Sequence, residues 1–404
     1  MPESKDHPHG SGSTLEVLLA FLRLGLTSFG GPVAHLGYFR ADIVERRRWL
    51  DEASYADIVA LCQFLPGPAS SQTAVSLGIL RAGLPGGLAA WAGFSLPSAL
   101  ALIAFGYGVD AVGDLSQAAW LHGLKIVAVA VVAQAVWNMA RNLCPDRERA
   151  TIAVGAALLV LAMPSAVGQM GAIAIGALIG WGLFRDTAVR PQAHLGFTIK
   201  RSVAVGALIA FVLLLVGLPV ASTTGIHVVQ MVDAFYRSGA LVFGGGHVVL
   251  PLLQAAVVPP GWLDNNAFLA GYGAAQAVPG PLFTFAAYLG TVMRPSPNGV
   301  LGGLICLVAI YLPTFLLLVG VLPFWDGLRQ RAGIQAALRG VSAAVVGLLL
   351  AALYTPVWTS AINGPRDFAV GITAFLALQL WKVPPWLVVI AGAVVTEALS
   401  LVSL

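Results

Sequence analysis

Charged residues are scarce in this sequence. Only 10% of its 404 residues are Asp, Glu, Lys or Arg, whereas an ordinary soluble domain has about 25%. The chain is 58% hydrophobic, and several windows without any charge exceed the roughly 18 apolar residues that indicate a membrane span. These windows are 88–109, 151–184, 202–232, 299–325 and 340–365. The composition excludes an ordinary soluble protein and predicts an all-α polytopic membrane protein.

Cysteine is also scarce, and the usual motifs of enzymes are missing. Cys62, Cys144 and Cys306 form no C-x-x-C pair, so we expect neither a disulfide framework nor a metal site. The sequence has no nucleophile–base arrangement and no phosphate-binding G-x-x-x-x-G-K-[ST] motif. We therefore expect no cofactor, no enzymatic activity, no direct use of ATP and no nucleic-acid partner. The polar segment 1–13 has no apolar core, which favours a cytoplasmic tail over a cleavable signal peptide.

Two halves of the sequence repeat each other. At offsets between 213 and 216 residues the aligned pairs are Arg23 with Arg237, 29–31 (FGG) with 243–245, 63–68 (QFLPGP) with 276–281 (QAVPGP), and 96–97 (LP) with 312–313. The matches keep their order, which indicates a tandem duplication of the kind that many transporters contain. We expect a first repeat over residues 14–185 and a second over 228–404. The linker 186–227 would contain one connecting transmembrane helix.

The second repeat is predicted to be inverted relative to the first. Segment 39–52 carries four arginines, while its counterpart 252–265 carries no basic residue. One hairpin later the pattern is reversed, since 108–119 has no basic residue and 325–339 has three arginines. Basic loops stay in the cytoplasm. This rule, with one extra crossing between the repeats, places the N-terminus in the cytoplasm and the C-terminus outside the inner membrane.

The segments beside the glycine and proline motifs are too short to cross a bilayer. Residues 15–28 would extend about 21 Å as a helix, against a hydrocarbon core of about 30 Å. We expect re-entrant, broken helices with tips at Gly30-Gly31 and at 66–68, and matching tips that enter from the opposite face. The tips would meet near the bilayer midplane, where non-helical backbone must line a cavity.

Such tips are suited to an anion. Each break starts a new helix, whose N-terminal N–H groups carry a partial positive charge. Glycine lets an oxygen approach the backbone closely, and the arginine before each tip can donate to two oxygens. Two arginines would balance a charge of −2, so the sequence predicts a site for a dianionic oxyanion between the repeats. The predicted binding residues are Arg23, Arg237, Gly30, Gly31, Gly244, Gly245, Gly246, Gln63, Gln276, Gly67, Gly280, Ser70, Ser71 and Thr284.

The same residues have structural interpretations that stay open. The two arginines could reach toward water at an interface, and the glycines could permit close helix packing. His35 and His247 are not in register, and we interpret them as structural. Cys62 has no counterpart in the second repeat, so we expect no redox role for it.

These motifs resemble the chromate ion transporter family, the ChrA-type proteins. The resemblance is carried by SFGGPVAHLGYFR (28–40), QFLPGPASSQTAVSLG (63–78), FGGGHVVLPLL (243–253) and QAVPGPLFTFAAYLG (276–290), and it covers both halves, as in the long two-domain form. It implies an inner-membrane carrier that exports chromate and confers chromate resistance, with sulfate as a competing dianion. The first repeat has Pro32 where the second has Gly246, which leaves open whether both tips contribute equally.

The leading hypothesis is thus a secondary exporter of chromate in the lipid bilayer. A sulfate-type oxyanion transporter or exchanger and an anion channel are the alternatives. The sequence leaves open whether transport is uniport, proton antiport or exchange, and Asp57, Asp233 and Glu45 are candidate protonatable groups. The physiological oxyanion and the oligomeric state also stay open, with a homodimer as one option.

Overall fold

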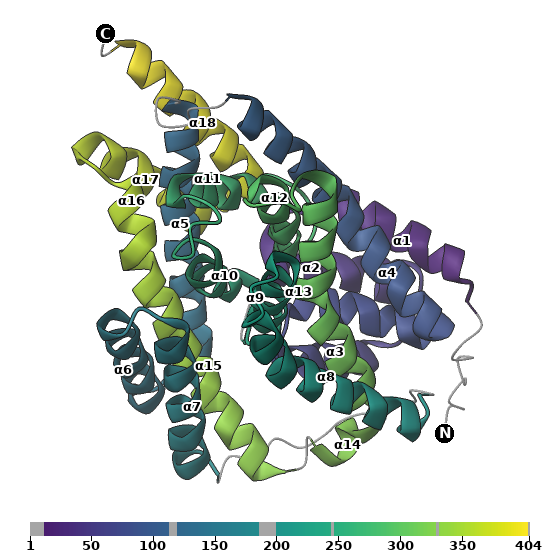
Figure 1. The fold of residues 1–404 in the computed structure, drawn as a ribbon. Coiled ribbons are helices and arrows are strands. Elements are labelled where there is room, and N and C mark those ends of the chain that lie inside the picture. The colour runs from purple at the N-terminus through teal and green to yellow at the C-terminus, as the bar shows by residue number, and fades with distance from the viewer. Residues whose placement is uncertain (1–11, 113–118, 186–198, 244–245, 329–330, 403–404) are drawn as a thin grey trace.

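A computed structural model describes residues 12–112, 119–185, 199–243, 246–328 and 331–402, and this part of the chain contains helices and no strand (Figure 1). The elements of the first half and the connecting helix are α1 (Thr14–Thr27), α2 (Gly31–Phe39), the π-helix η1 (Arg40–Arg46), α3 (Glu52–Phe64), α4 (Ala69–Val112), α5 (Ala119–Leu143), α6 (Arg147–Ala162), α7 (Ala166–Leu183) and α8 (Arg201–Ser222). Those of the second half are α9 (His227–Ala240), η3 (Gly246–Val248), α10 (Val249–Val257), α11 (Asn265–Ala275), η4 (Leu282–Thr284), α12 (Phe285–Val292), α13 (Gly299–Val321), η5 (Leu322–Phe324), α14 (Trp325–Leu328), α15 (Ala332–Ala352), η6 (Leu353–Trp358), α16 (Thr359–Ala361), α17 (Pro365–Gln379) and α18 (Pro385–Val402).

Five helical stretches in the described chain are long and apolar enough to cross a membrane. They are 69–109, 119–143, 201–222, 299–324 and 332–361. The connecting helix α8 is apolar on nearly every side, yet Ala204 is its one buried residue. A helix that exposes so many apolar side chains is stable in lipid and not in water. The protein is an all-α polytopic membrane protein, as the composition predicts.

The helices are broken where the sequence predicts breaks. Helix α1 ends at Thr27, Gly30 and Gly31 follow with φ of 100° and 78°, and α2 begins there with a proline in its first turn. Only glycine adopts such positive φ values readily. Helix α4 is also interrupted, because Ala82 and Gly83 have non-helical backbone angles. It is therefore a hairpin of two helices, 69–81 and 84–112.

Glycine pairs hold the two arms of each hairpin together. The backbones of Gly78 and Gly86 lie too close for a side chain on either residue. In the second half Gly290 of α12 and Gly302 of α13 make the equivalent contact. Matching glycines thus produce matching helical hairpins in the two halves, as small residues do in other membrane helix pairs.

The two halves are interleaved and do not lie side by side as separate units. Helix α5 of the first half packs against α17 and α18 of the second, and α15 of the second half packs against α6 and α7 of the first. Figure 1 shows α6 and α7 along the lower part of α15 and α18 beside α5. Gly123 allows the close approach of α5 to α18, and Gly340 allows that of α15 to α7. Each half therefore supplies the central helix around which a helix pair of the other half packs.

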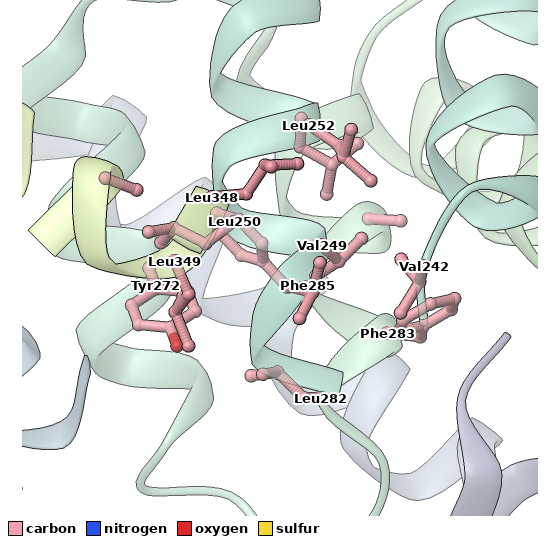
Figure 2. Close-up of a cluster of buried hydrophobic side chains, with 14 of the residues drawn as sticks. Val242, Val249, Leu250, Leu252, Tyr272, Leu282, Phe283, Phe285, Leu348 and Leu349 are labelled. Carbon is pink, nitrogen blue, oxygen red and sulfur yellow. The ribbon is translucent and has the colours of Figure 1, made fainter. Parts of the chain in front are cut away.

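A buried hydrophobic cluster supports the broken segments of the second half (Figure 2). Side chains from α10, α11, η4, α12 and α15 meet in it, and the labelled members are Val242, Val249, Leu250, Leu252, Tyr272, Leu282, Phe283, Phe285, Leu348 and Leu349. Leu282 and Phe283 of this cluster directly follow the proline–glycine–proline turn at 279–281, and Val278, which precedes the turn, packs against the cluster. The turn is thereby fixed against a rigid surface, because close-packed interiors resist displacement.

Candidate functional site

The helix breaks of the two halves meet through a reciprocal pair of backbone hydrogen bonds. The N–H of Gly67 donates to the carbonyl of Val242 just after α9, at 2.6 Å. The N–H of Gly280 donates to the carbonyl of Ser28 just after α1, at 2.9 Å. At the sequence offsets given above, Gly67 corresponds to Gly280 and Ser28 to Val242. We call the region around these two bonds the crossing.

Glycine is required at both tips of the crossing. Gly67 and Gly280 have φ of 128° and 95°. A Cβ on Gly280 would lie 2.9 Å from Oγ of Ser98, and one on Gly67 would lie 3.1 Å from Oγ1 of Thr314. Ser98 and Thr314 are themselves equivalent in the two halves. Each tip therefore sits against a hydroxyl on the long helix of the opposite half.

Two histidines flank the crossing from opposite halves. A Cβ on Gly31, at the start of α2, would lie 3.8 Å from Nε2 of His247. Nδ1 of His247 shares a hydrogen bond of 2.9 Å with the hydroxyl of Tyr272. His35 follows one turn into α2, is 1% exposed, and packs edge-on against Phe94 with ring centroids 5.2 Å apart. The sequence did not predict that the two histidines converge, and their interpretation as structural stays a prediction.

Several buried polar groups at or near these breaks have no hydrogen-bond partner within the described residues. They are Oγ of Ser28, both ring nitrogens of His35, Oγ1 of Thr314 and Nε2 of Gln276. A buried polar group without a partner costs about 1–3 kcal/mol. A hydroxyl, an imidazole N–H and an amide NH₂ can all donate to an oxyanion. The crossing therefore collects unused donors beside the N-terminus of α2, a nine-residue helix.

Three predicted hydroxyl residues lie at the starts of the helices that follow the tips, and all three are buried. Ser71 Oγ lies 3.5 Å from the hydroxyl of Tyr311 in the other half, whereas the hydroxyl of Thr284 donates to the carbonyl of Pro281 at 2.8 Å. Ser70 lies in the first turn of α4. The hydroxyl proton of Thr284 is thus used to hold its own turn, so the two halves differ here.

The other predicted residues are not all at the crossing. Gln63 is exposed on α3, while Gln276 ends α11 next to the second tip. Gly246 begins η3, and Gly244 and Gly245 lie outside the described residues.

Arg237 lines a cavity of about 530 Å³ that is open on one side. Its Nε and Nη2 donate to the two carboxylate oxygens of Asp233 at 2.8 and 2.5 Å. The cavity is bounded by α7, α8, α9, α10 and the loop after α10, and its lining residues are Gln169, Met170, Ser222, Gln230, Asp233, Ala234, Arg237, Ser238, Leu241, Leu252, Ala255, Ala256, Pro260 and Trp262. Leu241, one of the lining residues, directly precedes Val242 of the crossing in the chain.

Arg23 has different surroundings from Arg237. It is exposed on α1, it is absent from the Arg237 cavity, and no acidic side chain among the described residues forms an ion pair with it. The position one turn before Arg23 is Leu19, whereas the position one turn before Arg237 is Asp233. The structure therefore does not bring the two guanidinium groups together in this cavity, and their equal participation stays a prediction.

A signal in the sequence identifies further residues at the crossing that the predicted set omits. The matched Leu-Pro pairs at 96–97 and 312–313 are each flanked by hydroxyl residues, in SLPS (95–98) and YLPT (311–314). Proline within a helix leaves a backbone carbonyl without its usual N–H partner. Polar residues on both sides of such a proline, repeated at the same offset, indicate a functional region better than either feature alone.

The fold and the crossing define a class, namely a helical membrane protein in which broken helices from two sequence repeats meet. The profile of the chromate transporter family matches residues 15–181 and 229–396, which is most of the chain. This chain belongs to the chromate transporter family.

Relatives of known name span nearly the whole chain. It is 26% identical over 393 residues to a "Probable chromate transport protein" of Synechococcus elongatus, covering 96% of each chain. It is 29% identical over 385 residues to the "Chromate transport protein" of Pseudomonas aeruginosa, covering 91% of this chain and 87% of the relative. It is 34% identical over 166 residues to the "Uncharacterized transporter YwrB" of Bacillus subtilis, covering 40% of this chain and 82% of the relative. No solved structure matches.

Proposed function

We propose that this chain is a secondary carrier that exports chromate across the inner membrane and so confers resistance to chromate. Membership of the chromate transporter family and the names of two long relatives support chromate as the substrate. The observation that carries the proposal is the crossing, where glycine tips from the two halves form reciprocal hydrogen bonds among buried, unused donors.

The chemistry of the crossing suits a tetrahedral dianion. The N-terminus of α2 offers backbone N–H groups and a partial positive charge. Ser28 and Thr314 add hydroxyl donors that have no hydrogen-bond partner among the described residues, and the buried imidazole of His35 lies beside them. The Arg237 cavity would be the approach to this region from the second half, since it reaches the residue next to Val242.

The direction of transport follows from the membrane potential. The sequence has no nucleotide-binding motif, so the driving force must come from gradients. An inside-negative potential of about 100 mV favours the outward movement of a dianion by about 4.6 kcal/mol. That energy corresponds to roughly a thousandfold concentration ratio or more.

The orientation and the repeats are part of the same proposal. We place the repeats at 14–185 and 228–404, in opposite orientations, with the N-terminus in the cytoplasm and the C-terminus outside. The concentration of arginines in segment 39–52 supports this orientation. In the structure Arg40 pairs with Glu45 and Glu52, and Arg46 and Arg47 both pair with Asp42. The four arginines of the segment are matched by four acids, so its net charge is zero, and the orientation rests on the arginines themselves, which the positive-inside rule counts irrespective of Asp and Glu.

Uptake of labelled chromate by inside-out vesicles tests the proposal, since uptake there corresponds to export from the cell. We expect Arg23→Ala to abolish uptake while the protein still inserts in the membrane. Arg237→Ala would leave the buried Asp233 without its partner and could fail through instability. The double variant Arg237→Ala/Asp233→Leu avoids this problem, and we expect it to abolish uptake too.

Arg366→Ala is the matched control for these variants, because Arg366 is an exposed arginine at the start of α17, far along the chain from the crossing. Wild-type uptake in this control, with none in the Arg23 variant and the double variant, supports the proposed path. Full chromate uptake by the Arg23 variant and by the double variant would show that neither arginine takes part in transport. Competition by sulfate and molybdate would rank the anions, and acceleration by chromate on the far side of the membrane would distinguish a carrier from a channel.

A further inference from the structure

The Asp233–Arg237 pair is a feature of one half only. Asp233 is 4% exposed at its side chain and accepts two hydrogen bonds from Arg237, which is 32% exposed. The equivalent helix of the first half has Leu19 and Arg23 at these positions. The duplication therefore does not account for Asp233, and a nearly buried acid in an apolar membrane protein needs a specific role.

The cavity around the pair contains no other charge. Among its lining residues only Asp233 and Arg237 are ionisable. The helices α8, α10 and α13, which pack against α9, and α7, which lines the cavity, carry no charged side chain except Arg201 at the far end of α8. Other titratable groups on α9 and beside the cavity are Tyr236, whose hydroxyl donates to the carbonyl of Phe211, His227, whose ring packs against Trp262 at 4.9 Å between centroids, and Asp264, which caps α11.

Three of the neutral polar side chains that line the cavity already donate a hydrogen bond elsewhere, and none of the neutral ones, Gln230 included, carries a charge. The hydroxyls of Ser222 and Ser238 donate to backbone carbonyls of their own helices, at 2.7 and 2.8 Å. Gln169 donates to the carbonyl of Pro251 at 3.4 Å. The attraction of the cavity for an anion therefore depends on whether the positive charge of Arg237 is compensated by Asp233.

We propose that Asp233 couples proton binding to oxyanion binding at Arg237, so that one proton is taken up for each dianion bound. With Asp233 ionised, the pair has no net charge and a carboxylate stands beside the guanidinium. With Asp233 protonated, the pair has a charge of +1 and the fork of Arg237 can turn to the anion. An anion near an ionised carboxylate favours its protonation, and the coupling is reciprocal by thermodynamic necessity.

This inference rests on the proposed function and adds that the proton and the oxyanion bind to the carrier together. A proton that binds together with the anion moves in the same direction, so the transported unit would carry one negative charge instead of two, and a potential of about 100 mV would favour its export by about 2.3 kcal/mol, half of the value for the bare dianion. Proton antiport, in which the two occupy the carrier alternately, would require the opposite sign. The cavity is open on one side, which gives a proton access to Asp233.

Chromate binding to the purified full-length protein in detergent tests the inference. The dissociation constant is measured between about pH 7.5 and pH 9, where chromate is almost wholly the dianion. We expect the wild-type dissociation constant to rise by up to about tenfold per pH unit, as for a single linked proton. In Asp233→Asn the slope should vanish, and proton uptake on chromate binding in weakly buffered solution should be lost with it.

Asp264→Asn is the matched control, because asparagine caps a helix as well as aspartate does and Asp264 lies outside the cavity. It should keep the wild-type slope. If Asp233→Asn does not fold, Asp233→Leu reproduces the residue of the first half and serves instead. A wild-type slope in either Asp233 variant, or a flat wild-type profile, overturns the inference while chromate binding still stands. Absence of any chromate binding to the wild-type protein would instead count against the proposed function.

Discussion

Substitution of Gly280 by alanine tests whether the tips of the two halves pack as the structure shows. Gly280 has a φ of 95°, and an alanine Cβ would lie 2.9 Å from Oγ of Ser98 and 3.0 Å from the carbonyl oxygen of Phe94. A side chain at positive φ costs about 1–2 kcal/mol, and crowding against a packed backbone adds about 1–3 kcal/mol. We expect Gly280→Ala to lower the free energy of unfolding by about 2–5 kcal/mol.

Gly261→Ala is the matched control for this substitution. Gly261 has a φ of 78°, and a Cβ there would meet nothing within 4 Å. It therefore carries the backbone strain and the change in unfolded-chain entropy without the crowding. Unfolding by a denaturing detergent, followed by tryptophan fluorescence, should show Gly280→Ala less stable than Gly261→Ala by about 1–3 kcal/mol. Equal stability of the two variants would refute the argument that the tip is held against the opposite half.

Two further predictions concern packing and pH. Gly290→Leu should destabilise the protein by several kcal/mol in the same unfolding assay, because the backbone of Gly302 occupies the space that any side chain would need. Gly155→Leu is the control and should be nearly neutral, because a Cβ on Gly155 would meet nothing within 4 Å. Asp146 caps α6, and hydrogen bonds from the side chain and backbone of Arg149 hold its pKa below the usual value. Asp146→Ala should therefore cost about 0.5–2 kcal/mol at neutral pH, and this difference should begin to shrink below about pH 4, where the unfolded chain becomes protonated, and continue to shrink until the pH falls below the lowered pKa of the native carboxylate. A stability difference between wild type and Asp146→Ala that grows as the pH falls would contradict the role of Asp146 as a helix cap with a lowered pKa.

The class of protein and the positions of the breaks could be predicted from the sequence because both depend on local properties. Long uncharged windows specify membrane helices, and Gly30-Gly31 and the two PGP motifs interrupt them wherever the chain goes. The 213-residue offset between the two PGP motifs also pairs Gly67 with Gly280, and the two glycines make reciprocal hydrogen bonds in the structure.

The partners of each residue could not be predicted, because they depend on how the halves interleave. Asp233 lies one helical turn before Arg237 and compensates the charge of Arg237 in the structure. The alignment of Arg237 with Arg23 does not show this pairing. His35 and His247 are out of register, yet the folded chain brings both to the same crossing. Asp233 has no acidic counterpart in the first half, and the sequence indicates it only as one of three candidate protonatable groups, with Asp57 and Glu45.

The position of bound chromate tests the central claim most directly. X-ray diffraction from crystals of the chromate complex, measured at the chromium absorption edge, would locate the metal of the anion without ambiguity. The account predicts a chromium peak at the crossing or in the adjoining Arg237 cavity, within contact of Ser28, Thr314, the N-terminus of α2 or the guanidinium of Arg237. A peak remote from both regions, with these groups making no contact to the anion, would contradict it.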